Sequence, residues 1–242
     1  MRIAQISDTH LSVDHPSRTN DLERCIAQVN TLDPQPDMVV HTGDVAHNGL
    51  PEEYETARRL LDTLKAPVVV LAGNRDRRAP LIDAFADLGY LPPDASFVQY
   101  AIDRFPVRLV CIDTVSTASN KGHMCKHRLD HLAALLDEDP AKPTVVFMHH
   151  PPFEVSVGPD PFHFEAESAA RALQALIAQH NNIVAARCGH VHRDTTGHIG
   201  TVPAAIMSCC ANDLRKGETL PVATGTPLYL LHDLEPAISA TG

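Results

Sequence analysis

The sequence of 242 residues predicts an α/β protein in which two mixed β-sheets pack as a sandwich flanked by helices, giving four αββα layers. Apolar, β-branched runs alternate with stretches in which apolar residues recur at helical spacing, and this alternation is typical of α/β folds. The apolar runs are nearly continuous, which favours strands covered on both faces. Additional apolar runs between these units exceed what one sheet needs and predict the second sheet.

The elements follow in chain order. Five runs each end in a polar or glycine-containing turn, and they span residues 3–7, 38–42, 68–71, 144–148 and 183–188. Further strands are expected at residues 97–102, 107–112, 202–207 and 228–231. Helices are expected at residues 21–32, 52–64, 80–88, 128–136 and 165–179. The second of these helices follows Pro51, a residue suited to a first helical turn.

Composition narrows the classes of function. No linker, repeat or low-complexity stretch divides the chain, so one domain is expected over 1–242, with C-terminal strands within 201–234. Twenty basic against 30 acidic residues give a formal charge of −10, which argues against a nucleic acid duplex or a membrane as partner. No apolar run approaches a transmembrane span and no signal peptide is evident, so a cytoplasmic location is expected. The six cysteines include no CxxC pair and are expected to be reduced.

Candidate metal ligands follow the five ligand-bearing strands. In parallel sheets ligands gather beyond the carboxyl ends of the strands, and all of these residues fall there. The motif DxH is weak alone, whereas the alternate histidines of GHVH leave a strand in the same direction. The set comprises Asp8, His10, Asp44, Asn74, His149, His190 and His192, all of which lie within residues 8–192. This is enough nitrogen and oxygen for two neighbouring metal ions, an arrangement suited to displacement at phosphorus.

With these motifs in this order, the chain resembles the calcineurin-like metallophosphoesterase superfamily, whose pattern is DxH, GD, GNH(D/E), H and GHxH. The likeness runs from residue 3 to about residue 192 and is greatest to bacterial class III cyclic-nucleotide and glycerophosphodiester phosphodiesterases. It implies one metal on Asp8, His10 and His192, and a second on Asn74, His149 and His190. Asp44 would bridge the two, one carboxylate oxygen for each cation, beside a bridging water or hydroxide. Imidazole and carboxylate ligands suit Mn, Fe, Zn or Co, with Mn and Fe favoured.

One position departs from the family pattern, because Arg75 stands where the relatives have a histidine that contacts the phosphate. Arginine can clamp phosphate oxygens but cannot release a proton near neutral pH. The catalytic candidates are therefore Arg75, Asn74 and His150. The proton donor that Arg75 cannot be is expected to be His150, with His47 or His163 as the alternatives. The same Arg75, His47 and His163 are the candidate substrate contacts, with the last on an expected lid over 153–164. The alternatives are a surface ion pair for Arg75 and a hydrogen bond to the backbone for His150.

The predicted function is hydrolysis of a small phosphodiester, either a cyclic nucleotide or a glycerophosphodiester, by attack of the metal-bridging hydroxide. Two alternatives stay open: a phosphomonoesterase that uses the same site, and a metal-binding scaffold without turnover. A homodimer or higher homo-oligomer is compatible with the resemblance. Asp76 could orient a ligand or cap a loop, His41 is expected in or near the core, and surface positions are expected for His123, His127, His131, His198 and His232.

Overall fold

The computed structural model describes residues 1–156, 160–217, 220 and 222–234. Its first sheet has the order β10 (Leu230–Asp233), β1 (Arg2–Ile6), β2 (Met38–His41) and β3 (Val68–Val70). The second has the order β4 (Tyr100–Ile102), β5 (Arg108–Ile112), β6 (Thr144–Met148), β7 (Ile183–Cys188), β9 (Val202–Ile206) and β8 (Thr195–Ile199). The helices are α1 (Pro16–Asn30), α2 (Pro51–Leu61), α3 (Arg78–Phe85), α4 (Lys126–Asp137) and α5 (Glu167–Gln179), with short 3-10 turns η1 (Ala86–Leu88) and η2 (Asn212–Leu214).

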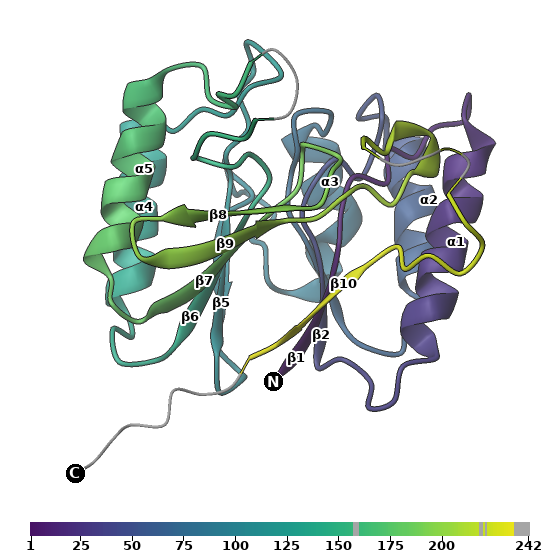
Figure 1. Cartoon of the computed structure of the whole chain (residues 1–242), viewed down its shortest axis with the longest axis horizontal. Helices are drawn as coiled ribbons and strands as arrows, with labels where there is room; N and C mark the ends of the chain where they lie inside the picture. Colours follow the sequence, from purple (N-terminus) through teal and green to yellow (C-terminus); the bar gives the residue numbers. More distant parts are fainter. Residues whose placement is uncertain (157–159, 218–219, 221, 235–242) are drawn as a thin grey trace.

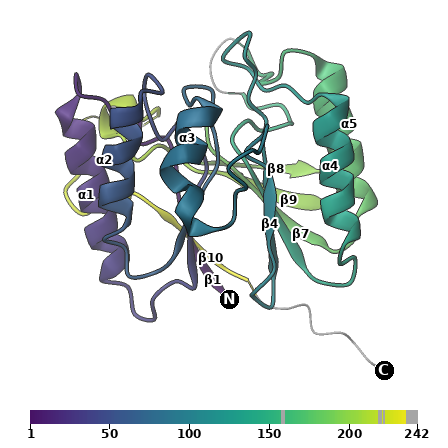
Figure 2. The same cartoon turned by 180° about the vertical axis from the view of Figure 1, so that it is seen from behind.

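The two sheets lie between two helical layers, as the sequence predicts (Figure 1). Helices α1 to α3 lie beside the first sheet, and α4 and α5 cover the second. Figure 2 shows the opposite side, where β4 lies at the near edge of the second sheet and α3 beside it. Both sheets are mixed: β1, β2 and β3 pair in parallel and β10 is antiparallel to β1, while β5, β6, β7 and β9 pair in parallel between antiparallel β4 and β8.

The core explains the continuous apolar runs. Along β5, Leu109 and Cys111 join the cluster that both sheets share, whereas Val110 and Ile112 face the cluster beneath α4 and α5. Successive side chains of a strand point to opposite faces, so a strand covered on both sides must be apolar throughout. This requirement made the strand that carries His149 recognisable from composition alone.

Strand β8 was not predicted, because it lacks such an apolar run. It lies at the edge of the second sheet and reads Thr-Thr-Gly-His-Ile, with Ile199 as its fully buried side chain. An edge strand needs little apolar surface because one side of it faces solvent. Helix α1 also begins earlier than predicted, at Pro16, since its first turn carries few apolar residues to mark it.

The prediction that His232 is a surface residue is wrong. Strand β10 pairs antiparallel with β1, and the imidazole accepts a 3.0 Å hydrogen bond from Nε of Arg187 and lies 2.9 Å from Oε1 of Gln5. Burial lowers the pKa of His232 to about 3, so the ring is neutral at physiological pH. His232 therefore belongs to a polar contact that joins the two sheets. Among the helices of the described residues, none has the length and apolarity needed to span a membrane.

Candidate metal centre

All seven predicted ligands meet where the carboxyl ends of the parallel strands converge. Asp8 and His10 follow β1, and Asp44 and Asn74 follow β2 and β3. From the second sheet, β6 supplies His149 and β7 supplies His190 and His192. Two sheets that face each other thus contribute to one site. A motif at the end of one strand could not show this by itself.

A first group of ligand atoms comes from Asp8, His10 and His192. Nε2 of His192 lies 3.2 Å from both Oδ1 of Asp8 and Nε2 of His10. Ligand atoms about 2.1 Å from one ion are separated by roughly 3 Å when their bonds meet at right angles. Oδ1 of Asp8 is buried and has no hydrogen-bond partner within the described part of the chain. A buried carboxylate oxygen without a donor is costly, and a cation at this point would satisfy it.

A second group is formed by Asn74, His149 and His190. Oδ1 of Asn74 lies 3.1 Å from Nε2 of His149 and 2.9 Å from Nδ1 of His190. One amide oxygen and two ring nitrogens thus point at the same place, at spacings that suit a shared ion. The Asn74 oxygen would bind a cation without adding negative charge.

Asp44 lies between the two groups. Its Oδ2 is 3.4 Å from Nε2 of His10 and 3.6 Å from Nε2 of His149. Its Oδ1 accepts a 2.7 Å hydrogen bond from the backbone N–H of Arg75. The expectation that each oxygen would serve one cation does not fit this arrangement, because a single oxygen faces both groups while the other is held by the backbone.

The backbone at the ligands is unusual. Asp8, His10, Asp44, His190 and His192 have φ between 45° and 72°, and they are the non-glycine residues with positive φ in the described ranges. This left-handed conformation costs about 1–2 kcal/mol for a residue with a Cβ. Strain of this kind persists where the surrounding structure imposes it, and it gathers at functional sites.

Hydrogen bonds to the backbone hold the ligand rings in orientation. Nδ1 of His149 lies 2.9 Å from the carbonyl oxygen of Thr42, and Nδ1 of His192 lies 3.2 Å from that of Leu214. An N–H donated from Nδ1 leaves Nε2 unprotonated and available to a metal. The sequence had not singled out Thr42, because a backbone acceptor leaves no residue-type signal.

Burial keeps three of the four ligand histidines neutral. It lowers the pKa of His10 to about 2 and also lowers the pKa of His149 and His190. Burial raises the pKa of Asp44, and the adjacent carboxylate of Asp8 raises it further. Burial also acts to lower the pKa of His192, but the Asp8 carboxylate beside it outweighs this effect, so the pKa of that ring is raised. Three neutral imidazoles, His192 and two crowded carboxylates form a donor set that a divalent cation would stabilise.

Gly73 is a structural requirement that sequence reasoning missed. An added Cβ there would lie 2.2 Å from Oδ1 and 2.3 Å from the backbone nitrogen of Asp44. The signal was present as the glycine immediately before Asn74.

Asp76 lies on the same turn, and its carboxylate accepts backbone hydrogen bonds from Val45, Ala46 and Gly73 and one from the hydroxyl of Tyr54. Asp76 is therefore a loop cap, the second of its two predicted roles.

Two further histidines have both ring nitrogens engaged. In the core, as predicted, His41 lies 3.0 Å from Oγ1 of Thr9 through Nε2 and accepts from the backbone of Gly43 at Nδ1. For His150, Nδ1 lies 2.9 Å from Oγ1 of Thr114 and Nε2 lies 3.2 Å from the carbonyl oxygen of Asn120. Although His150 is close enough to His149 and His190 to be grouped with them, this geometry favours a supporting role over metal binding or proton transfer.

The remaining candidates lie at the rim. Arg75 and His47 line a cleft of about 590 Å³ that Asn74 also lines. Nδ1 of His47 is also 3.5 Å from Nδ1 of His10, so it borders a ligand as well as the cleft. His163 stacks edge-on against His190, with ring centroids 5.0 Å apart. The expected lid over 153–164 contains residues 157–159, which lie outside the described residues, and Pro159 is among them.

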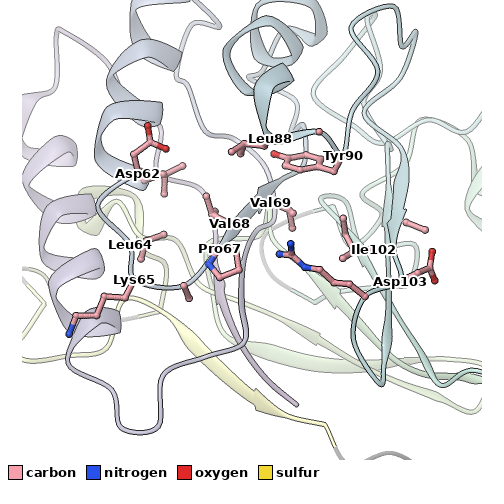
Figure 3. Close-up of a pocket in the computed structure, with 15 residues that line it drawn as sticks. Asp62, Leu64, Lys65, Pro67, Val68, Val69, Leu88, Tyr90, Ile102 and Asp103 are labelled. Atoms are coloured by element: carbon pink, nitrogen blue, oxygen red, sulfur yellow. The ribbon is translucent and has the colours of Figure 1, made fainter.

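A larger cavity of about 770 Å³ lies elsewhere, along the outer edges of β3 and β4 (Figure 3). Val68, Val69, Tyr90 and Ile102 are among its lining residues. None of the predicted site residues lines it. Because metal chemistry needs the ligands described above, this cavity is not the candidate active site.

Comparisons with known proteins agree with this geometry. The family model described as calcineurin-like phosphoesterase matches residues 1–194. The glycerophosphodiester phosphodiesterase GpdQ of Enterobacter lignolyticus is 34% identical over 233 residues, which cover 89% of this chain and 82% of that protein. The 3',5'-cyclic adenosine monophosphate phosphodiesterase CpdA of Pseudomonas aeruginosa is 27% identical, covering 79% of this chain and 70% of that protein.

A solved structure supports the fold. The purple acid phosphatase PPD1 from yellow lupin superposes with a TM-score of 0.62 at 14% identity, covering 85% of this chain and 43% of that one. At this identity the likeness concerns the arrangement of the sheets and helices. With the family match over most of the sequence and the clustered aspartate and histidine ligands, the chain belongs to the calcineurin-like phosphoesterase family of hydrolases.

Proposed function

We propose that this protein hydrolyses small phosphodiesters at a centre of two metal ions. The observation that carries the proposal is the position of Asp44, whose Oδ2 lies within 3.6 Å of a ring nitrogen from each of the two ligand groups. The first ion would be held by Asp8, His10 and His192 and the second by Asn74, His149 and His190. Both would share Asp44.

Mn or Fe is favoured for both positions, and Zn or Co would also suit neutral imidazole with carboxylate oxygen. Bound ions would lower the pKa of a shared water and offset the negative charge of the phosphate. The protein itself supplies preorganised ligands, because the hydrogen bonds at His149 and His192 fix their rings before any ion arrives.

Arg75 would bind phosphate oxygens. Its backbone N–H is bound to Asp44, and its exposed side chain lines the cleft together with Asn74 of the second ligand group. The planar guanidinium suits phosphate oxygens but remains protonated, so it would stabilise charge and would not donate a proton. Of the remaining candidates for the acid, His47 and His163 are less tightly engaged than His150.

The substrate class follows from the relatives, which are named for glycerophosphodiesters and for cyclic adenosine monophosphate. Both kinds of molecule contain a phosphodiester with one negative charge. We therefore propose a glycerophosphodiester or a cyclic nucleotide as substrate. A cytoplasmic location and self-association stay predictions.

The proposal is tested by the turnover of bis(p-nitrophenyl) phosphate and of p-nitrophenyl phosphate, with chelated protein before and after addition of Mn²⁺. We expect metal-dependent hydrolysis with a preference for the diester. A preference for the monoester would assign a phosphomonoesterase, and two bound metals without turnover would support a scaffold. Asp44→Asn should reduce diester turnover more than about a hundredfold. Asp83→Asn removes an exposed carboxylate from α3 and serves as the matched control.

A further inference from the structure

The cleft beside the candidate centre carries more positive charge than one phosphodiester requires. Its lining residues include Asn74, a predicted metal ligand, together with Arg75 and Arg77. The protein as a whole has a formal charge of −10. A concentration of cations in one cleft of an acidic protein is therefore a local feature that calls for a ligand of opposite charge.

Arg77 is held at the cleft by its aliphatic stem. A Cβ on Gly49 would lie 2.6 Å from Cγ of Arg77 and 3.2 Å from its Cδ, so the stem packs directly on this glycine. Within the described part of the chain, neither the guanidinium of Arg77 nor that of Arg75 has an ion-pair or hydrogen-bond partner. Arg78 differs, because its guanidinium is bound to the carboxylate of Asp113 at 2.7 Å.

Among the residues that the structure describes, no carboxylate that lines the cleft is free to offset these charges. Asp76 is the acidic residue that lines the cleft, and its oxygens already accept three backbone N–H groups and the Tyr54 hydroxyl. Helix α3 begins at the same wall, at Arg78, and its N terminus has no side-chain cap. Because Pro80 in the first turn has no N–H, the N–H groups of Arg78 and Ala79 and the helix dipole are what make this end favourable for an anion.

A single phosphodiester bound at the metal centre and contacted by Arg75 would leave Arg77 and the start of α3 unused. We propose that this wall binds a second phosphate group of the substrate, so that the preferred substrates are phosphodiesters with an additional phosphate on one of their two arms. The proposal rests on the function proposed above and specifies the substrate class of the same site. Guanidinium groups and backbone N–H donors together match the several oxygens of a phosphate.

The test uses three diesters on one scaffold, bis(3-hydroxypropyl) phosphate and its analogues with a phosphate or a carboxylate at the end of one arm. Because the scaffold is otherwise symmetric, the anionic arm can occupy either side of the scissile phosphorus. Products are quantified by liquid chromatography and mass spectrometry with Mn²⁺-loaded protein. The measured quantity is the ratio of kcat/KM for the phosphate-bearing diester to kcat/KM for the neutral one.

We expect a ratio above about ten, and Arg77→Ala should reduce it about tenfold, since a hydrogen bond to a charged group is lost. Arg77→Lys should restore most of the ratio, and Arg77→Glu should reduce it further. Arg104→Ala, which removes an exposed charge from the other cavity, should leave the ratio unchanged. The ratio should also fall with added salt, because exposed charges are screened.

A ratio near one for the wild-type protein, or a ratio unaffected in Arg77→Ala, would overturn the inference while leaving the phosphodiesterase proposal intact. An equal preference for the carboxylate-bearing diester would also overturn it, by showing that charge alone is recognised. Failure of the function proposed above has a different signature, namely no metal-dependent turnover of bis(p-nitrophenyl) phosphate or of any member of the series.

Discussion

Replacing His192 by glycine and, separately, by alanine distinguishes backbone strain from the loss of the imidazole. Both variants remove the same ligand atoms, and they differ only by one Cβ. His192 has φ of 61°, inside the left-handed region. The comparison is made on chelated protein, so that metal binding does not contribute to either stability.

The expected difference follows from two opposing effects. A Cβ in the left-handed conformation costs about 1–2 kcal/mol. Glycine gives the unfolded chain more freedom, which costs the glycine variant about 0.4–1 kcal/mol. The glycine variant should therefore be the more stable by roughly 1 kcal/mol, which corresponds to about 2–4 °C in Tm for a chain of this size.

Urea unfolding followed by circular dichroism measures the difference, and His149 provides the control. His149 is a ligand whose φ is not positive, so there the alanine variant should be the more stable, by about 0.4–1 kcal/mol. If alanine at position 192 equals or exceeds glycine in stability, the backbone at this ligand is not strained in the metal-free protein. At Asp44, where φ is 53°, the glycine variant should again be more stable than the alanine variant.

Three other predictions concern the centre and its surroundings. Gly73→Ala should lower the bound metal by at least one ion per chain, because its Cβ would lie 2.2 Å from Oδ1 of Asp44. Mass spectrometry of the metal measures this, and full occupancy would contradict it. Gly89→Ala, with φ of 76° and open space around it, is the control and should lose stability only. Arg75→His should raise turnover of methyl phenyl phosphate relative to methyl p-nitrophenyl phosphate by about tenfold or more, since an added acid helps a poor leaving group most; an unchanged ratio would show that protonation is not limiting. The wild-type protein should lose free energy of unfolding between pH 6.5 and 5.5, because the unfolded state protonates His232 near pH 6.5 while the folded state, with a pKa of about 3, does not. His232→Gln should make this loss smaller by about 1 kcal/mol in urea unfolding. Equal losses in the two proteins would refute the assignment.

Much of the fold was predictable because burial on both faces leaves a compositional trace. The predicted strands at 144–148 and 183–188 coincide with β6 and β7. Each is buried between a helical layer and the other sheet, so each must be apolar along most of its length. The two-sheet sandwich was predictable for the same reason. Strand β8 was not, because an edge strand with a polar outer face has no such requirement.

The residues that meet at the centre were predictable, whereas their detailed roles were not. Motifs at the ends of successive strands must converge when the strands are parallel, which brings Asp8, Asp44 and Asn74 together. Side-chain hydrogen bonding depends on neighbours distant in sequence. His150 illustrates this, since its partners Thr114 and Asn120 lie more than 25 residues away and engage both of its ring nitrogens. His232 was misassigned for the same reason.

The left-handed ligands give a physical reason for the residue types of this site. In an extended strand, residues i and i+2 point the same way along the sheet face, but a ligand beyond the strand must fold back over its end. At Asp8 and His10, and again at His190 and His192, the chain makes this turn with positive φ at both members of the pair. Aspartate and histidine tolerate that conformation better than most side chains and also bind metals. The DxH and HxH patterns therefore satisfy a backbone requirement and a chemical one together, which is why they occur where each strand ends.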